Sequence, residues 1–216
     1  MKYALVIFDL DGTILNTLGD LASAVNHALL KNGYPQHTTD DVRRFVGNGV
    51  EKLIRRSVPQ GTGEAQIMKT LSDFRAYYDL HAADTTRPYP GIRELMCRLR
   101  ESGTAVAVHS NKYDTAVAEL CALHFPNLYD EALGEGTRSP RKPDPTGVYT
   151  LMGDCNAERE NTIYIGDSEV DLATAANAGV ECAWVSWGFR KATEMNIPEN
   201  VHKFDTPEAL QAYLLG

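Results

Sequence analysis

Short apolar runs alternate with stretches of helical periodicity along most of the chain. Four of these runs have the length and the unbroken apolar character of strands buried on both faces: residues 3–8, 104–109, 162–165 and 180–187. Between them, apolar side chains recur at helical spacing, as at Ile92, Leu95, Met96 and Leu99. A further helix over 169–178 would end at Gly179, a residue type that favours a left-handed C-terminal cap. This alternation predicts an α/β fold with a parallel sheet and right-handed crossovers.

The alternation is interrupted between residues 16 and 86, where no convincing strand occurs. Helical patterns cover 18–32, 39–46, 50–57 and 64–82. The segment TTRPYPG, residues 85–91, then supplies two prolines and a glycine before the α/β pattern resumes. We therefore expect an α/β domain formed by residues 1–15 and 87–216, with an all-helical domain, residues 16–86, inserted after the first strand.

Charge and composition narrow the set of partners. The net charge is −8 and no run of Lys or Arg occurs, so we expect no binding to nucleic acid or to an anionic membrane surface. The four cysteines are far apart and show no metal-binding spacing, which is typical of thiols in a reducing compartment. No segment has the pattern of a signal peptide or of a membrane span. We expect a cytoplasmic protein, a monomer or a weak homodimer, that acts on a small molecule.

Two carboxylates follow the first predicted strand in the stretch FDLDGT, residues 8–13. Like charges this close raise each other's pKa, so a metal ion, a shared proton or solvent exposure must accommodate them. A calcium loop of the EF-hand type is excluded, because its sixth and twelfth positions would be Ile14 and Asp20 instead of Gly and Glu. A surface turn is a second interpretation. It does not explain why Asp9 and Asp11 stand at the carboxyl end of a central strand, where α/β sheets bind ligands.

Two other strand ends and one loop supply further polar residues: Ser110 with Asn111, Asp167 with Asp171, and Lys142 in the stretch SPRKPDP. Each has a structural alternative. Ser110 and Asn111 suit a helix N-cap, Ser168 and Asp171 suit an S-x-x-D capping pair, and Lys142 suits a solvated loop. Taken together, they bring several acids, a hydroxyl and an amine to one edge of the predicted sheet.

This set resembles the four motifs of the haloacid dehalogenase-like (HAD) phosphatase superfamily: Asp9-x-Asp11-Gly12-Thr13, Ser110, Lys142 and Gly166-Asp167-x-x-x-Asp171. The resemblance spans nearly the whole chain, and the helical insert stands where that superfamily carries its C1-type cap. It implies a Rossmann-type core with an inserted cap. Asp11 argues against carbon–halogen cleavage, since members with that activity lack this acid. Transport ATPases of the superfamily need membrane helices, which this sequence lacks.

The resemblance also implies residue roles. Asp9 would be the nucleophile that forms an aspartyl-phosphate, and Asp11 the general acid and base. Ser110 and Lys142 would neutralise charge on the transferred phosphoryl group, with Thr13 and Asn111 contributing to substrate binding. Mg²⁺ would be the cofactor, bound by Asp9, Asp167 and the backbone carbonyl of Asp11. Asp171 and Ser168 would support these residues from behind.

The helical insert carries the stretch VGNGVEKLIRR, in which Gly47, Asn48 and Gly49 precede an amphipathic helix. Free N–H groups at this turn, together with Arg44, are candidates to receive a carboxylate or another anion of the substrate. The alternative is an ordinary helix-start turn beside a solvated basic face. With the stretches SNK, KPDP and WGFR, this segment resembles phosphoglycolate phosphatases, whose substrate carries a carboxylate near its phosphate.

The leading hypothesis is therefore a Mg²⁺-dependent phosphatase acting on a small phosphate ester, 2-phosphoglycolate first. A sugar phosphomutase of the β-phosphoglucomutase type, or a pyrophosphatase or nucleotidase of the same superfamily, is the alternative. A regulatory protein without activity is disfavoured, since it would have no reason to keep costly clustered charges. Two residues depart from the common pattern of the subgroup: Asn16 replaces a frequent Asp, and His109 replaces an aliphatic residue.

Overall fold

A computed structural model describes residues 2–216. The chain divides into two compact units. The first, called here the α/β unit, comprises the chain up to Leu15 and from Pro88 onward; the second, the helical unit, is Asn16–Arg87. The chain crosses between them at β2 (Leu15–Asn16) and β3 (Arg87–Pro88), two short strands that pair with each other.

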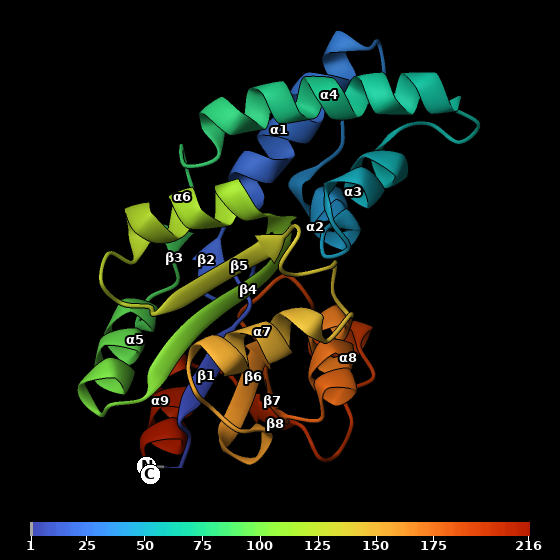
Figure 1. Ribbon diagram of the computed structural model, residues 1–216. Helices are drawn as coiled ribbons and strands as arrows, with labels where there is room; N and C mark the ends of the chain where they lie inside the picture. The colour runs from blue at the N-terminus through green and yellow to red at the C-terminus, as the bar shows by residue number, and fades with distance from the viewer. Residues whose placement is uncertain (1) are drawn as a thin grey trace. The chain divides into compact units, whose positions relative to one another are not determined.

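Six strands of the described α/β unit form one sheet in the order β5-β4-β1-β6-β7-β8 (Figure 1). They span Leu5–Phe8 (β1), Ala105–Tyr113 (β4), Glu131–Glu135 (β5), Thr162–Gly166 (β6), Glu181–Val185 (β7) and His202–Phe204 (β8). All the pairings between them are parallel. Strand β1 is central, with Leu5 opposite Ala105 of β4 and Thr162 of β6. The predicted α/β fold with a parallel sheet is confirmed.

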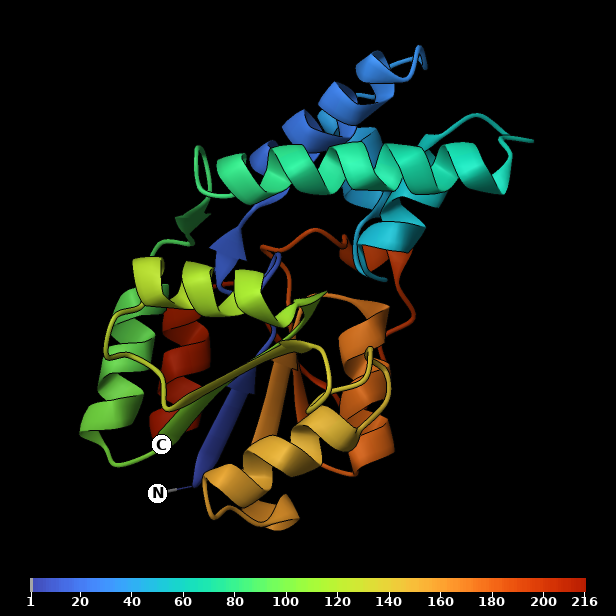
Figure 2. The same cartoon turned by 45° about the horizontal axis from the view of Figure 1, so that its top comes forward.

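Helices cover both faces of this sheet: α5 (Ile92–Glu101), α6 (Asp114–His124), α7 (Thr146–Asp154), α8 (Glu169–Ala178) and α9 (Pro207–Leu215), with short 3₁₀ helices at Arg159–Asn161 (η1) and Ala192–Glu194 (η2). Figures 1 and 2 show α7 and α8 on one face and α5 with α9 on the other. Between the sheet and the helices α7 and α8 lies one apolar cluster, in which Ile7, Val148, Leu151 and Tyr164 are fully buried. Burial of each such side chain stabilises the fold by about 1.5–3 kcal/mol, which holds the sheet rigid beneath its polar carboxyl edge.

The structure contains strands that the hydrophobic pattern did not predict. Strand β4 extends beyond the predicted end at His109 as far as Tyr113, after a register irregularity against β5. Strands β5 and β8 were missed because they are short, lie at the two sheet edges and carry charged residues. Gly134 in β5 is required for space, since a Cβ there would fall within 2.6 Å of the Asp114 nitrogen. Edge pairing of this kind depends on a neighbouring strand and leaves little periodicity in the sequence.

The helical unit contains, in residues 16–87, four helices: α1 (Leu18–Lys31), α2 (Thr39–Phe45), α3 (Val50–Ser57) and α4 (Glu64–His81). Each agrees with its predicted range to within one residue. Helices α1 and α4 pack along each other and bury Leu21, Val25, Leu71 and Phe74. A capping box begins α2, where the hydroxyl of Thr38 accepts from the N–H of Asp41 at 3.2 Å. The local sequence therefore determines these helices well.

Asp20 ties the two ends of the helical unit together. Its carboxylate is buried in the first turn of α1 and accepts hydrogen bonds from the N–H groups of Thr85 (2.9 Å) and Thr86 (2.8 Å). The hydroxyls of both threonines donate to it as well, at 2.6 and 2.7 Å. Burial opposes the ionised form, but the hydrogen bonds from Thr85 and Thr86 prevail and lower the pKa of Asp20. Asp20, whose position in the sequence excludes an EF-hand calcium loop, thus binds Thr85 and Thr86 at the end of the helical unit.

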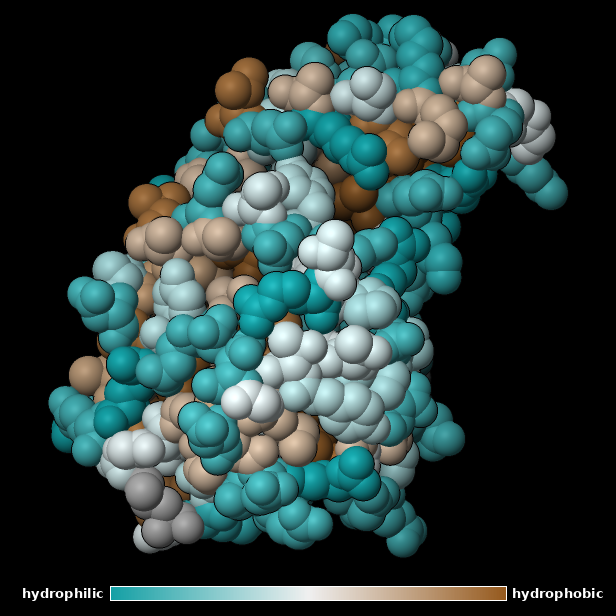
Figure 3. Space-filling view, viewed as in Figure 1, coloured by the Kyte–Doolittle hydropathy of each residue, from teal (hydrophilic) through white to brown (hydrophobic). Residues whose placement is uncertain are grey.

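The side of the molecule drawn in Figure 3 is largely polar, with apolar side chains gathered in small separate patches. No helix within residues 2–216 combines the length and the apolarity that crossing a membrane requires.

Replacing Asp20 should destabilise the helical unit. Asp20→Ala leaves four donors on Thr85 and Thr86 without their acceptor, so we expect a loss of about 2–4 kcal/mol in the free energy of unfolding. Urea denaturation followed by circular dichroism measures this. Asp84→Ala, which removes an exposed acid paired with His81, is the control and should cost under about 1 kcal/mol. Equal effects of the two substitutions would contradict the role of Asp20.

Candidate active site

The carboxyl ends of the central strands bring the predicted site residues of the α/β unit together. Asp9 follows β1, Ser110 and Asn111 lie in the extended end of β4, and Asp167 follows β6. Lys142 reaches the same edge from the loop before α7. Parallel strands end on one side of a sheet, so residues far apart in sequence converge here.

Lys142 occupies the centre of this group. Its ammonium nitrogen Nζ lies 2.7 Å from Asp9 Oδ1 and 2.7 Å from Asp171 Oδ1, and it also donates to the Tyr164 hydroxyl and the His109 carbonyl, each at 3.2 Å. The side chain is 3% exposed. Burial by itself would lower the pKa of Lys142, but the charges of Asp171 and Asp9 outweigh it and hold the pKa well above its usual value. Lys142 is therefore a fixed positive charge.

Three buried acids, Asp9, Asp167 and Asp171, form an acidic cluster in the described part of the chain. One carboxylate oxygen from each acid lies within 4.8 Å of those from the other two. Burial raises the pKa of Asp9 well above its usual value, as does the charge of Asp171, against the opposing charge of Lys142. Burial, with the charge of Asp171, raises the pKa of Asp167 to about 7. A group of three acids and one lysine favours a further cation, and buried carboxylate oxygens are donors suited to Mg²⁺.

Asp171 and Ser168 lie behind this cluster. The N–H and hydroxyl of Ser168 both donate to Asp171 Oδ2, at 3.1 and 2.6 Å, which is the capping pair predicted for the start of α8. Asp171 Oδ1 is bonded to Lys142. Gly166 passes so close that a Cβ there would lie 2.6 Å from Asp171 Oδ2. Asp171 thus begins a helix and also holds Lys142.

The turn after Asp9 depends on Gly12. Its φ of +91° lies in the left-handed region, and a Cβ at this position would fall 2.6 Å from Asp167 Oδ2. Thr13 is fully buried and its hydroxyl donates to Asp9 Oδ2 at 3.3 Å. Asp11 remains partly exposed and pairs with Lys112, whose Nζ lies 3.3 Å from Asp11 Oδ2. The two acids of the FDLDGT stretch therefore meet different cations.

Asn111 links β4 to the loop of Lys142. Its side chain accepts from the backbone N–H of Lys142 at 2.7 Å and donates to the carbonyl of Lys142 at 3.3 Å. Ser110, 2% exposed, accepts from the N–H of Lys112 at 3.2 Å. The structure thus gives Asn111 contacts to the loop of Lys142, whereas the sequence suggested a helix N-cap or a role in substrate binding.

Sequence reasoning left several residues around the site without a role. Tyr164 and His109 pack behind Lys142, and His109 Nε2 lies 2.9 Å from the Ser139 hydroxyl. Burial, then the charge of Lys142, holds the pKa of His109 well below its usual value, so this ring is neutral. Lys112 belongs to the SNK stretch, whose sequence indicates no role for this lysine, and it pairs with Asp11. In each case the sequence signal was a polar residue next to a motif. The contacts of that residue became known only from the fold.

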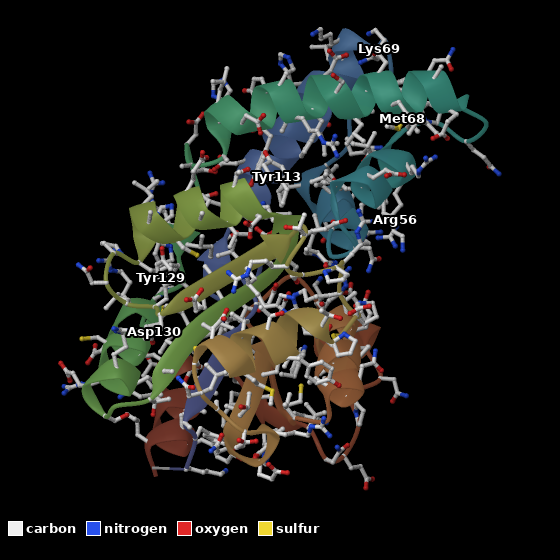
Figure 4. All side chains as sticks on the ribbon, in the orientation of Figure 1. Arg56, Met68, Lys69, Tyr113, Tyr129 and Asp130 are labelled. Carbon is white, nitrogen blue, oxygen red and sulfur yellow. The ribbon has the colours of Figure 1, made fainter. Side chains whose placement is uncertain are left out.

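The candidate residues of the helical unit form a turn before α3. Gly47 and Gly49 have φ values of +117° and +80°, and Asn48 Oδ1 accepts from Arg56 Nη2 at 2.6 Å. Arg56, labelled in Figure 4, also donates to the Phe45 carbonyl at 2.7 Å. Arg44 is exposed and engaged with Asp40. The turn is therefore braced from within its own unit, chiefly by Arg56.

The chain is similar to known proteins over nearly its whole length. A family model described as haloacid dehalogenase-like hydrolase matches residues 6–185. A phosphoglycolate phosphatase from Cereibacter sphaeroides is 34% identical over 217 residues, which cover 97% of this chain and 98% of that protein. Another, from Pseudomonas putida, is 33% identical over 192 residues, covering 86% and 70%. A solved structure from Lactobacillus delbrueckii subsp. bulgaricus, assigned as a phosphoglycolate phosphatase, has 34% identity, complete coverage of both chains and a TM-score of 0.94. The predicted resemblance is confirmed.

The acidic cluster should make stability depend on pH in a defined direction. With a folded pKa of about 7 against an ordinary value of 3.8, Asp167 binds its proton more tightly in the folded state. Its contribution is therefore complete below about pH 4 and is lost as pH rises through about 7. We expect the melting temperature of the metal-free protein to fall over this range, and less steeply in Asp167→Asn. Calorimetry from pH 4.5 to 8 measures this.

The exposed acid Asp205 supplies the control. The melting temperature of Asp205→Asn should fall with pH as steeply as that of the wild type. Mg²⁺ should raise the melting temperature of the wild type more at pH 8 than at pH 5, because protons compete with the cation. Identical slopes for Asp167→Asn and the wild type would show that Asp167 does not carry the effect.

Proposed function

The chain belongs to the haloacid dehalogenase-like hydrolase family, and we propose that it is a Mg²⁺-dependent phosphatase of a small phosphorylated metabolite, 2-phosphoglycolate, acting through an aspartyl-phosphate. The observation that carries the proposal is the setting of Asp9. Lys142 Nζ contacts one carboxylate oxygen of Asp9 at 2.7 Å, and the Thr13 hydroxyl contacts the other. These contacts orient the carboxylate for attack on phosphorus.

Asp11 is the general acid and base. It follows Asp9 by two residues, yet its side chain is 17% exposed, while that of Asp9 is buried. Partial exposure lets Asp11 reach both a leaving group and water. In the first step it protonates the oxygen that leaves phosphorus; in the second it takes a proton from the water that hydrolyses the aspartyl-phosphate. The nearby ammonium of Lys112 holds this carboxylate in place.

Ser110 and Lys142 bind the phosphoryl group. Phosphoryl transfer spreads negative charge over the equatorial oxygens, so positioned donors lower the barrier. The Ser110 hydroxyl lies at the end of β4, and the ammonium of Lys142 is already fixed beside Asp9. Since Asn111 fastens the backbone of Lys142 to β4, these two donors keep their relative positions through the reaction.

The acidic cluster is suited to a divalent cation, which Asp9, Asp167 and the backbone carbonyl of Asp11 would hold. A cation there supplies charge neutralisation for the phosphoryl oxygens and for the attacking carboxylate. It would also offset the burial and the negative charge of Asp171, which together raise the pKa of Asp9 and Asp167. Asp171 is engaged with Lys142 and Ser168, so we assign it to support of the lysine.

The choice of 2-phosphoglycolate rests on the relatives at 33–34% identity, which bear that name, and on the turn of the helical unit. The turn Gly47-Asn48-Gly49 stands directly before α3, and the N-terminus of a helix favours an anion such as a carboxylate. The bond from Arg56 to Asn48 holds the turn in its shape. We assign discrimination among phosphate esters to this turn.

Asp9→Asn should abolish turnover, because an amide of nearly the same shape is a poor nucleophile. We expect kcat for phosphoglycolate to fall more than about 10⁴-fold, with cooperative thermal unfolding retained. Steady-state phosphate release measures it, with Asp205→Asn as the control. Near-normal kcat in a purified, folded variant would remove Asp9 from its role.

The substrate is tested by kcat/KM over phosphoglycolate, p-nitrophenyl phosphate, pyrophosphate, nucleoside monophosphates and β-glucose 1-phosphate, with Mg²⁺ and with EDTA. We expect a metal-dependent preference of about a hundredfold for phosphoglycolate, or about 2.7 kcal/mol. Isomerisation of the sugar phosphate with slow ester hydrolysis would make the protein a mutase. A flat profile would retain the phosphatase and remove the named substrate.

Asn48→Ala should change selectivity more than chemistry. Loss of the Arg56 contact loosens the turn, so we expect the ratio of kcat/KM for phosphoglycolate over p-nitrophenyl phosphate to fall about fivefold or more. The exposed Gln66 on α4 supplies the matched control, Gln66→Ala. If both substrates lose the same factor, the turn has a structural role only.

A further inference from the structure

The segment Trp187–Arg190 after β7 contacts two different parts of the acidic site. The indole nitrogen of Trp187 donates to the Thr13 carbonyl at 3.0 Å. The backbone N–H groups of Phe189 and Arg190 both donate to Asp167 Oδ2, at 2.5 and 3.3 Å. The segment therefore joins the turn that follows Asp9 to the acid that follows β6, although none of its residues belongs to the four motifs.

Gly188 allows this approach. A Cβ at Gly188 would lie 2.5 Å from Asp167 Oδ2 and 2.5 Å from the Gly12 carbonyl oxygen. The φ of Gly188 lies outside the left-handed region that favours glycine. Other residues are therefore allowed by backbone conformation and excluded by space alone. Gly12 meets the same carboxylate, where a Cβ would fall 2.6 Å from Oδ2, so two glycines enclose Asp167.

The segment is anchored on both sides of these contacts. Trp184 on β7 donates from its indole nitrogen to the carbonyl of Asp167 at 2.8 Å, which fixes the backbone of the acid. Arg190 Nε pairs with Glu169 Oε2 at 3.1 Å, in the first turn of α8. Phe189 is 5% exposed. The N–H donors that meet Asp167 thus lie in a turn after β7 that these contacts hold in place.

The hydrogen bonds that Asp167 accepts from this segment both end on Oδ2. An oxygen held by two amide donors has a fixed orientation, and this also fixes the direction of the other oxygen, Oδ1, of an acid that belongs to the cluster with Asp9 and Asp171. Groups that bind a metal ligand from behind fix its orientation, and their loss commonly weakens metal affinity by about 10- to 100-fold.

We propose that Trp187–Arg190 is a positioning segment for the divalent cation: it holds Asp167 by Oδ2 and the Asp11–Thr13 turn by Trp187, so that Asp167 Oδ1 and the Asp11 carbonyl are preset to bind the ion. This role rests on the proposed metal-dependent function and extends it to residues outside the motifs. It also gives a physical reason for the small residue at position 188, since a Cβ there would meet Asp167 and the Gly12 carbonyl.

Gly188→Ala tests the role. The added methyl group must displace Asp167 or the Gly12 carbonyl, so we expect the Mg²⁺ dissociation constant, from isothermal titration calorimetry on metal-free protein at pH 7.5, to rise about tenfold or more. In kinetics, the Mg²⁺ concentration for half-maximal rate should rise by a similar factor, while kcat at saturating Mg²⁺ recovers to within about threefold of the wild type. A purely structural defect would lower kcat at every Mg²⁺ concentration.

Gly153→Ala is the matched control. Gly153 lies near the end of α7, and a Cβ there meets nothing within 4 Å, so this variant should bind Mg²⁺ as the wild type does. Trp187→Phe removes the hydrogen bond to the Thr13 carbonyl and keeps an aromatic ring. It should raise the Mg²⁺ dissociation constant about threefold or more, and it decides the matter if Gly188→Ala does not fold.

Wild-type Mg²⁺ affinity in a folded Gly188→Ala would overturn the inference. Wild-type affinity in Trp187→Phe, with Gly188→Ala unfolded, would do the same. A third outcome separates the inference from the proposed function. If the wild type itself binds no Mg²⁺ in the calorimeter and its rate is unaffected by EDTA, the metal-dependent function fails first and the segment loses its role with it.

Discussion

The buried ammonium of Lys142 between Asp9 and Asp171 is the interaction on which the site depends. It connects the end of β1, the start of α8 and the loop before α7, three segments separated by long stretches of sequence. Removing one partner from a buried ion pair costs about 3–5 kcal/mol, since the remaining charge stays uncompensated. The apolar cluster under α7 and α8 keeps the sheet rigid. The charged groups of Lys142, Asp9 and Asp171 are therefore held close together.

The buried group contains more acids than basic residues, and this excess of negative charge supports the proposed metal-dependent chemistry. Burial, together with the charge of Asp171, raises the pKa values of Asp9 and Asp167, and a cluster of three acids beside one lysine favours another cation. Asp11, only two residues from Asp9, avoids this crowding because it is partly exposed and pairs with Lys112. Two carboxylates in one turn thereby acquire different environments, which is the condition for one to act as nucleophile and the other as acid and base.

Much of the fold could be predicted because its signals are local. The strands β1, β6 and β7 show continuous apolar runs, and the helices of residues 16–87 show periodicity within one residue of their observed bounds. The strands that were missed, β5 and β8, lie at the edges of the sheet and carry charged residues, so nothing in their own sequence distinguishes them from loops. The extension of β4 to Tyr113 likewise depends on its pairing with Glu135.

The sequence by itself determined which acids and hydroxyl stand at the ends of the buried strands, that Lys142 lies in a loop, and that Ser168 and Asp171 begin a helix together. Hydrophobic periodicity and capping act over a few residues, so they can be recognised in one dimension. Only the tertiary structure decided that Asn111 fastens the Lys142 backbone, that His109 is buried and neutral, and that Trp187–Arg190 encloses Asp167. Each of these contacts joins segments at least 20 residues apart, including the contact of His109 with Ser139. Such contacts arise because the parallel sheet brings strand ends to one edge. The residue type at one position does not indicate which distant residue it will contact.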